Sequence, residues 1–395
     1  MQQAAALAKL GDIAAAAGLR RVHILAWREL ADVEAGGSEL HAATIARLWA
    51  EAGVDVTMRT SYAQGAPPVM DRDGYHVVRR AGRYMVFPRA AFSEALHRHG
   101  PARDGLVEIW NGMPFFSPLW AHGPRVTWLH HVHGPMWDMA LPPHLARIGH
   151  LVERKIAPAL YRRSRIVTLS ESSRRELVDE LGFTPRLVDV VPPGIDPKYC
   201  PGGSRSSEPL VLAVGRLMPV KRFDALIKTI ARVRQSVPDA RLVVIGDGAE
   251  RWALERLVRD LDAEDWVSLP GRVGDAELVD LYRRASVLAS ASAAEGWGMT
   301  ITEAAACATP AVVSDINGHR DAVAADRSGL LANGDIELAN ALVRVLTDER
   351  FRRRLAAGAL DHATRYSWEA TAMATMRILA EEAHRLDASS RSSAR

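Results

Sequence analysis

Short apolar runs alternate with longer amphipathic segments along most of the chain. In the first half, apolar runs predict strands at residues 21–26, 54–59, 75–79, 106–110, 125–130 and 165–170. A helix is predicted at 36–52, beginning at a pair of glycines. This alternation is typical of a parallel sheet with helices on both faces, so the pattern predicts an α/β, doubly wound domain.

The pattern is interrupted once and then starts again. Residues 191–209 contain five prolines and three glycines, which is the composition of a linker. Beyond it, strands are predicted at 210–215, 241–245, 266–269 and 286–289, and helices at 222–235, 250–261 and 275–284. We therefore expect two Rossmann-like domains, with a ligand in the cleft between them at the carboxyl ends of the strands.

The predicted division of the chain has six parts. They are an N-terminal helical extension (1–20), an N-terminal acceptor-binding domain (21–195), a hinge linker (196–209), a C-terminal nucleotide-sugar-binding domain (210–370), a C-terminal helix expected to pack back on the N-terminal domain (371–386), and a disordered tail (387–395). The roles given to the two domains follow from the resemblance described below. The tail prediction rests on a Ser- and Arg-rich composition.

Composition narrows the class of protein. The 395 residues are 48% hydrophobic and 25% charged, which excludes wholesale disorder. Two cysteines, Cys200 and Cys307, cannot build a disulfide framework or a four-thiolate zinc site. The net charge of +3 gives no reason to expect a nucleic-acid partner. No apolar run of about 18 residues and no signal-peptide pattern is present, so we expect a cytoplasmic protein.

The strongest chemical motif lies at residues 292–310. Glu295 and Glu303 are separated by seven residues, and Gly296 and Gly298 introduce a helix. A helix N-terminus offers free amides to a phosphate, and each carboxylate could bind a pair of sugar hydroxyls. A helix with an acidic N-terminal region explains the same spacing equally well.

A second motif is the loop at 215–222, which follows a strand and precedes a helix. Arg216 and Lys221 would lie at the carboxyl end of that strand, where two cations could hold a diphosphate leaving group. Lysine occurs at only five positions in the chain, which makes Lys221 conspicuous. A solvated loop carries equal weight on this motif alone.

A third motif is the glycine pair Gly36-Gly37. Glycine lets a backbone approach a phosphate closely, so Gly37 is a candidate phosphate contact. An ordinary loop explains an isolated glycine pair better.

Three histidines end a predicted strand: His130, His131 and His133. Because strand ends face the expected cleft, His130 is predicted to face a ligand, whereas His131 and His133 could also pack or cap the loop. No cysteine or suitably spaced carboxylate completes a metal site here. Nearby tryptophans, including Trp137, fit either the core or a stacking surface for a sugar acceptor.

Together these motifs resemble glycosyltransferase family 4. The resemblance is carried by Glu295-x7-Glu303, the loop from Gly215-Arg216 to Lys221, and the stretches 191–196, 246–248, 314–321 and 328–331, in the family's order. It spans Arg21 to Trp368. It implies the GT-B fold, with two Rossmann-like domains facing across a cleft, a nucleoside-diphosphate sugar as donor, no metal and no cofactor, and retention of the anomeric configuration.

The resemblance also implies residue roles. Arg216 and Lys221 would bind the diphosphate, Glu303 the ribose and Glu295 the donor sugar, with His130 beside the transferred sugar. The implied catalytic set is Glu295, His130, Arg216 and Lys221. The implied donor contacts are Gly37, Gly215, Arg216, Lys221, Gly246, Arg272, Val273, Glu295, Gly296, Gly298, Met299, Thr300 and Glu303. His133 and Trp137 are the acceptor candidates, and the choice between His130 and His133 beside the transferred sugar stays open.

One position departs from the family pattern, and one motif competes with it. Ala308 stands where the family has glycine, and we expect this methyl only to tighten a packing position. Asp71-Arg72-Asp73 is formally the metal motif of the other large glycosyltransferase fold, but its surroundings predict a plain turn. Residues 246–248 lack the third glycine of a dinucleotide fingerprint, which argues against hydride transfer.

The expected activity is transfer of a mannose-, glucose- or N-acetylglucosamine-type hexose from a UDP- or GDP-sugar to an acceptor hydroxyl in a bacterial envelope glycoconjugate or secondary metabolite. A nucleotide-sugar epimerase and a non-catalytic nucleotide-sugar-binding protein are the alternatives. The chain could be a monomer or a homodimer. The basic stretch 147–165 would suit contact with the inner face of the membrane, although a solvated helix face explains it more simply.

Overall fold

A computed structural model describes residues 2–96, 102–134 and 136–393 and divides the chain into two compact units. Unit 1 comprises Met1–Gly194 and Trp368–Arg395, and unit 2 comprises Ile195–Ser367. The predicted hinge at 196–209 belongs to unit 2, because its side chains and backbone form hydrogen bonds with other residues of that unit. Lys198 Nζ lies 2.8 Å from a carboxylate oxygen of Asp275, and Arg283 Nε donates to the Cys200 carbonyl at 2.8 Å.

Unit 1 is built on an eight-stranded sheet of order β3-β4-β2-β1-β5-β6-β7-β8. Its strands are β1 Arg21–Leu25, β2 Asp55–Ser61, β3 Val69–Arg72, β4 Tyr75–Ala81, β5 Gly105–Trp110, β6 Arg125–Leu129, β7 Arg165–Thr168 and β8 Val188–Val190. All neighbouring pairs are parallel except β3 with β4. The carboxyl ends of the parallel strands therefore share one edge of the sheet.

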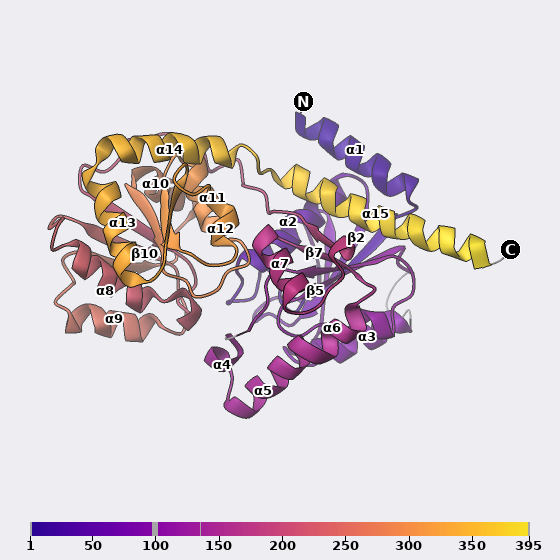
Figure 1. Cartoon of the computed structure of the whole chain (residues 1–395). Helices are drawn as coiled ribbons and strands as arrows, with labels where there is room; N and C mark the ends of the chain where they lie inside the picture. The colour runs from indigo at the N-terminus through magenta and orange to yellow at the C-terminus, as the bar shows by residue number, and fades with distance from the viewer. Residues whose placement is uncertain (1, 97–101, 135, 394–395) are drawn as a thin grey trace. The chain divides into compact units, whose positions relative to one another are not determined.

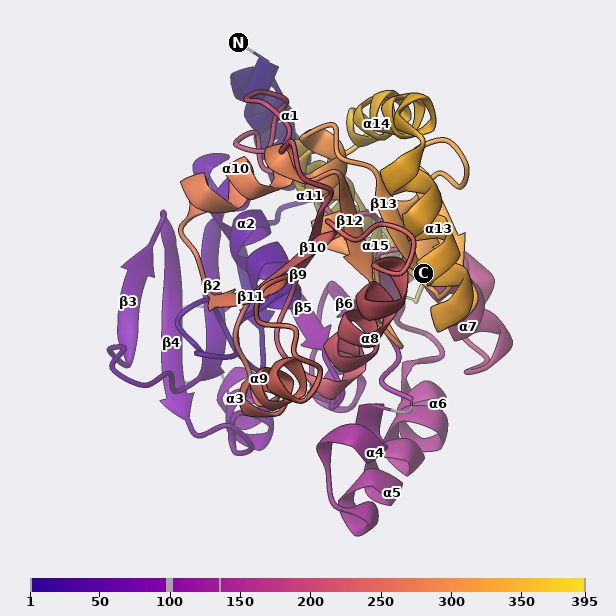
Figure 2. The same ribbon diagram turned by 90° about the vertical axis from the view of Figure 1, so that its left-hand side faces the viewer.

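The antiparallel pair β3–β4 lies at the edge of this sheet (Figure 2). Arg72 pairs with Tyr75, and the two residues between them, Asp73 and Gly74, have φ of 47° and 87°. Positive φ at both central residues is the geometry of a tight hairpin turn, for which Asp-Gly is a preferred sequence. The turn predicted at Asp71-Arg72-Asp73 is observed only at Asp73 and Gly74, because Asp71 and Arg72 are the last two residues of β3.

Helices cover both faces of the unit 1 sheet. They are α1 Gln2–Ala16, α2 Gly37–Glu51, α3 Val86–Ala95, α4 Met136–Ala140, α5 Pro143–Leu151, the π-helix η2 Val152–Ile156, α6 Ala157–Tyr161, α7 Glu171–Asp179 and α15 Trp368–Ser393, with 3₁₀ turns η1 Ser117–Leu119 and η3 Pro185–Leu187. In Figure 1, α1, α2 and α15 lie on one side of the sheet, and α3 and α6 on the other. The unit is therefore doubly wound.

The C-terminal helix α15 belongs to unit 1. It lies beside α1 and α2, and Trp49 Nε1 donates to the Ala372 carbonyl at 3.0 Å (Figure 1). The helix continues to residue 393, which differs from the disordered tail predicted at 387–395. Extending an existing helix costs far less than starting one, and the Ser389 hydroxyl donates to the Arg385 carbonyl at 2.9 Å in this last part. Residues 394–395 lie outside the described range.

Unit 2 contains a six-stranded, fully parallel sheet of order β11-β10-β9-β12-β13-β14. Its strands are β9 Leu210–Val214, β10 Arg241–Ile245, β11 Val267–Gly271, β12 Val287–Ser290, β13 Ala311–Ser314 and β14 Gly329–Ala332. Its helices are α8 Phe223–Val233, α9 Arg251–Asp260, α10 Asp275–Arg284, α11 Met299–Ala306, α12 His319–Ala322, α13 Asp335–Thr347 and α14 Glu349–Ala363, with the 3₁₀ turn η4 Pro219–Lys221.

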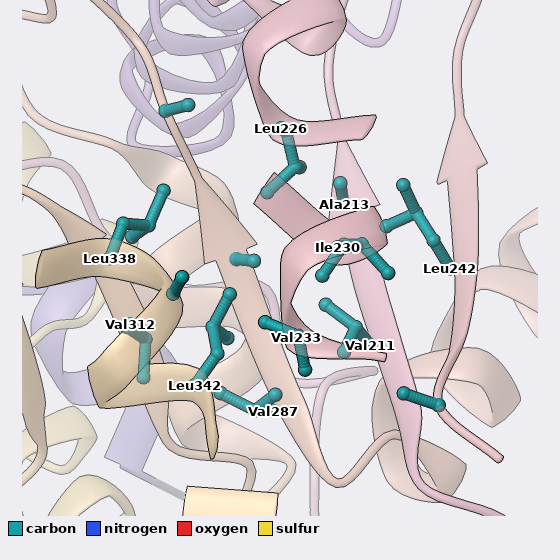
Figure 3. Packing of buried hydrophobic residues seen from close by; sticks show 14 of the residues in the cluster. Val211, Ala213, Leu226, Ile230, Val233, Leu242, Val287, Val312, Leu338 and Leu342 are labelled. Atoms are coloured by element: carbon teal, nitrogen blue, oxygen red, sulfur yellow. The ribbon is translucent and has the colours of Figure 1, made fainter. Parts of the chain in front are cut away.

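The core of unit 2 explains why its sheet is rigid enough to position a site. Leu226, Ile230 and Val233 are spaced along one face of α8 and are fully buried. Figure 3 shows them against Val211 and Ala213 of β9. Truncating such a side chain to alanine typically costs about 2–5 kcal/mol, because the cavity does not close fully. Both units are doubly wound α/β structures, as predicted.

Among the described residues, no helix is both long and apolar enough to cross a membrane. The basic stretch 147–165 runs from α5 through η2 and α6 into β7, and Ile148, Leu151 and Ile156 are exposed along it. Whether this surface meets a membrane stays a prediction.

Candidate functional site

Most of the predicted donor residues of unit 2 lie in loops after the carboxyl ends of its strands. Because the sheet is fully parallel, these loops share one edge. Gly215 to Lys221 follow β9, Gly246 follows β10, Arg272 and Val273 follow β11, and residues 291–298 follow β12. The arrangement brings motifs from four separate parts of the chain to one side of unit 2.

The loops after β9 and β10 pack directly on each other. Gly246 has a φ of 141°, and a Cβ there would lie 1.9 Å from the Gly215 carbonyl oxygen. The Gly246 amide also donates to the Gly271 carbonyl at 2.9 Å, next to Arg272. Any side chain at 246 would separate these loops, so this glycine sets the close approach of Gly215, Gly246 and Gly271.

The central contact of the site joins Lys221 and Glu295. Lys221 Nζ forms an ion pair with Glu295 Oε1, and the Ser292 hydroxyl donates to the same oxygen at 3.1 Å. The two side chains are 22% and 18% exposed, so both are largely shielded but reachable from solvent. Residues predicted for two different parts of a donor, its diphosphate and its sugar, are thus direct neighbours.

Electrostatics keep Glu295 ionised. Burial alone would raise the pKa of its carboxyl group, but the charges of Lys221 and His319 and the hydrogen bonds from Lys221 and Ser292 outweigh burial and lower it. His319 hydrogen-bonds through Nδ1 to the Ser314 carbonyl at 2.9 Å, and burial lowers its own pKa. The site therefore offers a fixed carboxylate beside an ammonium group.

A glycine holds the loop after β13 against Glu295. Gly318 has a φ of 81°, and a Cβ there would lie 2.6 Å from the Glu295 carbonyl oxygen. The close approach fixes the backbone on which the Glu295 side chain stands. This residue lies in the 314–321 stretch of the family resemblance.

The helix α11 begins at the same edge. Its N-cap, Gly298, has a φ of 105°, and Met299 and Thr300 form its first turn after the buried Gly296. The first amides of a helix have no carbonyl one turn earlier to bond, and they carry the positive end of the helix dipole. These amides suit a phosphate or a sugar oxygen.

Glu303 stands one turn further along α11 in a separate environment. It is 8% exposed, and Tyr282 Oη donates to its Oε2 at 2.8 Å. Burial raises the pKa of Glu303 to about 7, although the hydrogen bond from Tyr282 and the charge of Lys198 act to lower it. Among the described residues, no hydrogen bond joins Glu303 to Glu295, so the two carboxylates of the motif have different partners and different protonation.

The departure at Ala308 has a different consequence from the packing change expected. Ala308 has a φ of 57° and is the residue after the C-cap of α11. This left-handed conformation is the usual place of glycine at a helix end, and an alanine there is strained. The added methyl therefore costs backbone energy.

In unit 1, His130 follows the carboxyl end of β6 and meets the start of α2. Its Nδ1 is 2.9 Å from the Ser38 hydroxyl, and Ser38 follows Gly37, the first residue of α2. His130 is 4% exposed, and its Nε2 is buried with no partner among the described residues. Burial holds the pKa of His130 well below its usual value, so its imidazole is neutral.

His41 supports this arrangement from within α2. Its ring packs edge-on against the rings of Trp128 and His130, at centroid distances of 5.0 and 4.8 Å. Burial lowers the pKa of His41 to about 3, so this ring adds no charge beside His130 at neutral pH. Trp110 and Trp128 are themselves fully buried and belong to the core.

The two acceptor candidates, His133 and Trp137, share a buried carboxylate. Glu153 of η2 accepts from the His133 amide at 2.7 Å, from the Gly134 amide at 2.9 Å and from Trp137 Nε1 at 3.0 Å. The rings of His133 and Trp137 lie 5.0 Å apart. Burial raises the pKa of Glu153, whereas these three hydrogen bonds act to lower it. The ionised form of Glu153 is therefore stabilised by them.

Comparisons with known proteins agree with this layout. A sequence model described as "Glycosyltransferase Family 4" matches residues 35–199, and one described as "Glycosyl transferases group 1" matches residues 201–362. The chain belongs to glycosyltransferase family 4. A D-inositol 3-phosphate glycosyltransferase of Kineococcus radiotolerans is 31% identical over 87% of this chain and 90% of its own length.

A second relative supports the same membership for this glycosyltransferase. The D-inositol 3-phosphate glycosyltransferase of Stackebrandtia nassauensis is 39% identical, but the match spans only 52% of each chain, about half the length of that relative. The solved sucrose-phosphate synthase of Thermosynechococcus elongatus has 20% identity and a TM-score of 0.77, covering 90% of this chain and 97% of that one. The fold of the family 4 chain is therefore GT-B.

Sequence reasoning missed several residues of the glycosyltransferase's two sites. In unit 2 these are Ser292, His319 and Tyr282, and in unit 1 they are Ser38, His41 and Glu153. His41 could have been found from the sequence. It lies four residues after Gly37, and residues four apart in a helix lie on the same face. Glu153 gave no such signal, since it lies 20 residues from His133 in the chain.

Proposed function

We propose that this glycosyltransferase transfers a hexose from a UDP- or GDP-linked sugar to an acceptor hydroxyl, with retention of configuration and without a metal or cofactor. The Lys221–Glu295 ion pair at the carboxyl edge of the unit 2 sheet carries the proposal. An ammonium group can bind a diphosphate while its carboxylate partner accepts hydrogen bonds from sugar hydroxyls. The ion pair places both chemistries side by side.

The donor contacts are assigned from this centre outward. Arg216 and Lys221 bind the diphosphate, supported by the amides of Met299 and Thr300. Glu295 binds the sugar hydroxyls. Glu303 binds the ribose in its ionised form, and the backbone around Arg272 and Val273 lines the base pocket. The Gly215–Gly246–Gly271 packing fixes the spacing of these loops.

The proposed reaction breaks the bond between the anomeric carbon and the diphosphate oxygen. Arg216 and Lys221 stabilise the negative charge that develops on the leaving diphosphate. The acceptor hydroxyl bonds to the anomeric carbon on the face that the diphosphate leaves. Its proton passes to the departing phosphate oxygen, so the products are the glycoside and the nucleoside diphosphate.

Unit 1 is proposed to bind the acceptor. A neutral His130, whose Nε2 has no partner in the described part of the chain, can hydrogen-bond a hydroxyl without adding charge. His133 and Trp137, held by Glu153, offer a polar ring and a stacking ring. Because relatives at 31% and 39% identity carry the name D-inositol 3-phosphate glycosyltransferase, D-inositol 3-phosphate is the first acceptor to try.

The test is product analysis with matched lysine variants. UDP- and GDP-sugars are screened by thermal shift, since a ligand that binds only the folded state raises its apparent stability. The best donor is then incubated with D-inositol 3-phosphate, and released nucleoside diphosphate and new glycoside are measured. Lys221→Ala should lower turnover at least about 100-fold, while Lys228→Ala, an exposed lysine on α8, should leave it unchanged.

Three outcomes would count against the proposal. Unchanged activity in Lys221→Ala would remove the assignment of the diphosphate site. An epimerised nucleotide sugar without glycoside would indicate an epimerase. Donor binding without turnover at any acceptor tried would indicate a binding protein.

A further inference from the structure

A pocket lies in unit 1, away from the residues assigned above. It has a volume of about 640 Å³, including space open to solvent, and lies between α3 and the carboxyl-terminal halves of β2 and β4. Figure 2 shows α3 beside the end of β4. Its polar lining is Arg59, Thr60, Arg80, Arg89 and Ser93, and none of its described lining residues is acidic.

The sheet order separates this pocket from His130. Three strand spacings lie between β2, the nearer strand of the pocket, and β6 in the order β2-β1-β5-β6. At about 4.8 Å per spacing, that is about 14 Å along the sheet edge. A single sugar ring bound at His130 therefore cannot also fill the pocket.

An irregularity in β4 marks the pocket. Thr60 pairs with Arg79 and Ser61 with Ala81, so Arg80 is an extra residue without a partner in the register of β2. Such bulges re-aim side chains and are common beside functional sites. Arg80 is an exposed side chain in the lining of the pocket.

The charges around the pocket do not balance. Glu94 is the buried carboxylate behind it. It accepts from Arg59 Nε, from Arg103 Nη1 at 2.8 Å and from His23 Nδ1 at 2.9 Å. Burial would raise the pKa of Glu94, but His23, Arg59 and Arg103 outweigh it and lower it to about 2. One carboxylate therefore faces two buried guanidinium groups.

The two exposed arginines increase this excess. Arg80 and Arg89 line the same pocket, and no salt bridge of the described residues neutralises either of them. With Arg59 and Arg103 set against Glu94, the pocket region carries a net charge of about +3 from these five side chains. Guanidinium groups are the planar, multiple donors that phosphate recognition favours.

We propose that this pocket binds a phosphate group, with Arg80 and Arg89 as the donors that reach it and the buried Arg59 behind them. Thr60 and Ser93 add hydroxyls for its remaining oxygens. The phosphate belongs either to a soluble phosphate compound or to the headgroup of an anionic lipid. The site stands apart from the proposed donor and acceptor sites and does not depend on them.

The side chains at the rim bear on the source of the phosphate. Phe92 lines the pocket and is 60% exposed, and Tyr84 and Met85 near the start of α3 are 73% and 63% exposed. Apolar side chains beside arginines suit a phosphate attached to an apolar chain as well as a free one. The experiment therefore needs one arm for each source.

The test uses the full chain and inorganic phosphate. Phosphate is titrated at constant ionic strength, and binding is followed by calorimetry. The double variant Arg80→Gln/Arg89→Gln should weaken phosphate binding at least about tenfold, because it removes two charge-assisted donors. Arg175→Gln, an exposed arginine on α7, is the matched control and should bind as the unchanged protein does. Thermal unfolding checks that each variant is folded.

The second arm uses vesicles of phosphatidylcholine alone and with added phosphatidylglycerol. Sedimentation of the chain only with phosphatidylglycerol vesicles, lost in the double variant, would support the site with a lipid source. Phosphate binding lost in the double variant without vesicle binding would support a soluble source. Failure of both probes to bind, or equal binding of each probe to the unchanged chain and the double variant, would overturn the proposal. Donor turnover enters none of these readouts, so failure here leaves the proposed function standing.

Discussion

Replacing Glu303 by glutamine should have opposite effects on two quantities: it should raise the stability of the folded state and weaken donor binding. The folded state raises its pKa to about 7, whereas the ordinary value is 4.5. A raised pKa means that the folded state holds the proton more tightly than the unfolded state. Stability therefore falls as the pH rises from about 4.5 to 7, and the loss is complete above 7.

The magnitude follows from the difference between the two pKa values. At about 1.4 kcal/mol for each factor of ten in proton affinity, the ionised carboxylate costs about 3 kcal/mol at pH 8 and about 1 kcal/mol at pH 5. Glutamine keeps an oxygen that can accept from Tyr282 and carries no charge. At about 2–4 °C per kcal/mol for a unit of this size, we expect Glu303→Gln to raise the melting temperature by about 6–12 °C at pH 8 and by about 2–4 °C at pH 5.

The same variant should bind the donor poorly, because a neutral amide accepts hydroxyl donors more weakly than a carboxylate. The assay is thermal unfolding at pH 5 and pH 8, paired with calorimetric titration of the nucleoside diphosphate. Glu264→Gln, at an exposed glutamate after α9, is the control and should change neither result. A variant that is less stable at pH 8, or whose gain is the same at both pH values, would refute the reasoning.

Three further changes test other parts of the account. Ala308→Gly should stabilise unit 2 by about 1 kcal/mol, because glycine relieves the left-handed strain, and a melting temperature that does not rise would contradict this. Gly246→Ala should destabilise unit 2 by about 1–3 kcal/mol and weaken donor binding, since the new Cβ would clash with the Gly215 carbonyl oxygen. An unchanged free energy of unfolding would show that the two loops can move apart without cost. Glu153→Gln should raise the KM for the acceptor and leave the affinity for the donor unchanged, since its hydrogen bonds hold only the segment that carries His133, Gly134 and Trp137; an effect on donor titration would place Glu153 in a different role.

The regular elements were predictable where the sequence pattern is strong. The strand at 241–245 is a run of five residues after a turn, and it was predicted at its observed bounds. The strands β3 and β8 were missed, because β3 is four residues long with two apolar residues followed by two polar ones, and β8 is only three residues long. Their pairing comes from the tight turn beside β3 and from the neighbouring strand β7, respectively.

The site was predictable in its residues but not in its contacts. Lys221 stood out by its rarity and Glu295 by its motif, yet their ion pair joins positions 74 residues apart, across the edge of a parallel sheet. The different protonation of the two glutamates has two causes: Lys221 lowers the pKa of Glu295, whereas burial raises the pKa of Glu303. No spacing in the sequence contains that information, because it arises from packing.

The strain at Ala308 could be anticipated only in part. The sequence resemblance identified an alanine where the family has glycine, but the reason for glycine is a positive φ that only the backbone reveals. The same applies to Gly318, whose role is to let one loop lie on the carbonyl of Glu295.

The most direct test of the central claim is proton NMR of one reaction mixture, following the anomeric proton of the nucleotide sugar. The account predicts that this signal disappears and that a glycoside with the same anomeric configuration appears, together with one nucleoside diphosphate for each glycoside. It also predicts that neither change occurs with Lys221→Ala. An inverted glycoside, or an equal rate in that variant, would contradict it.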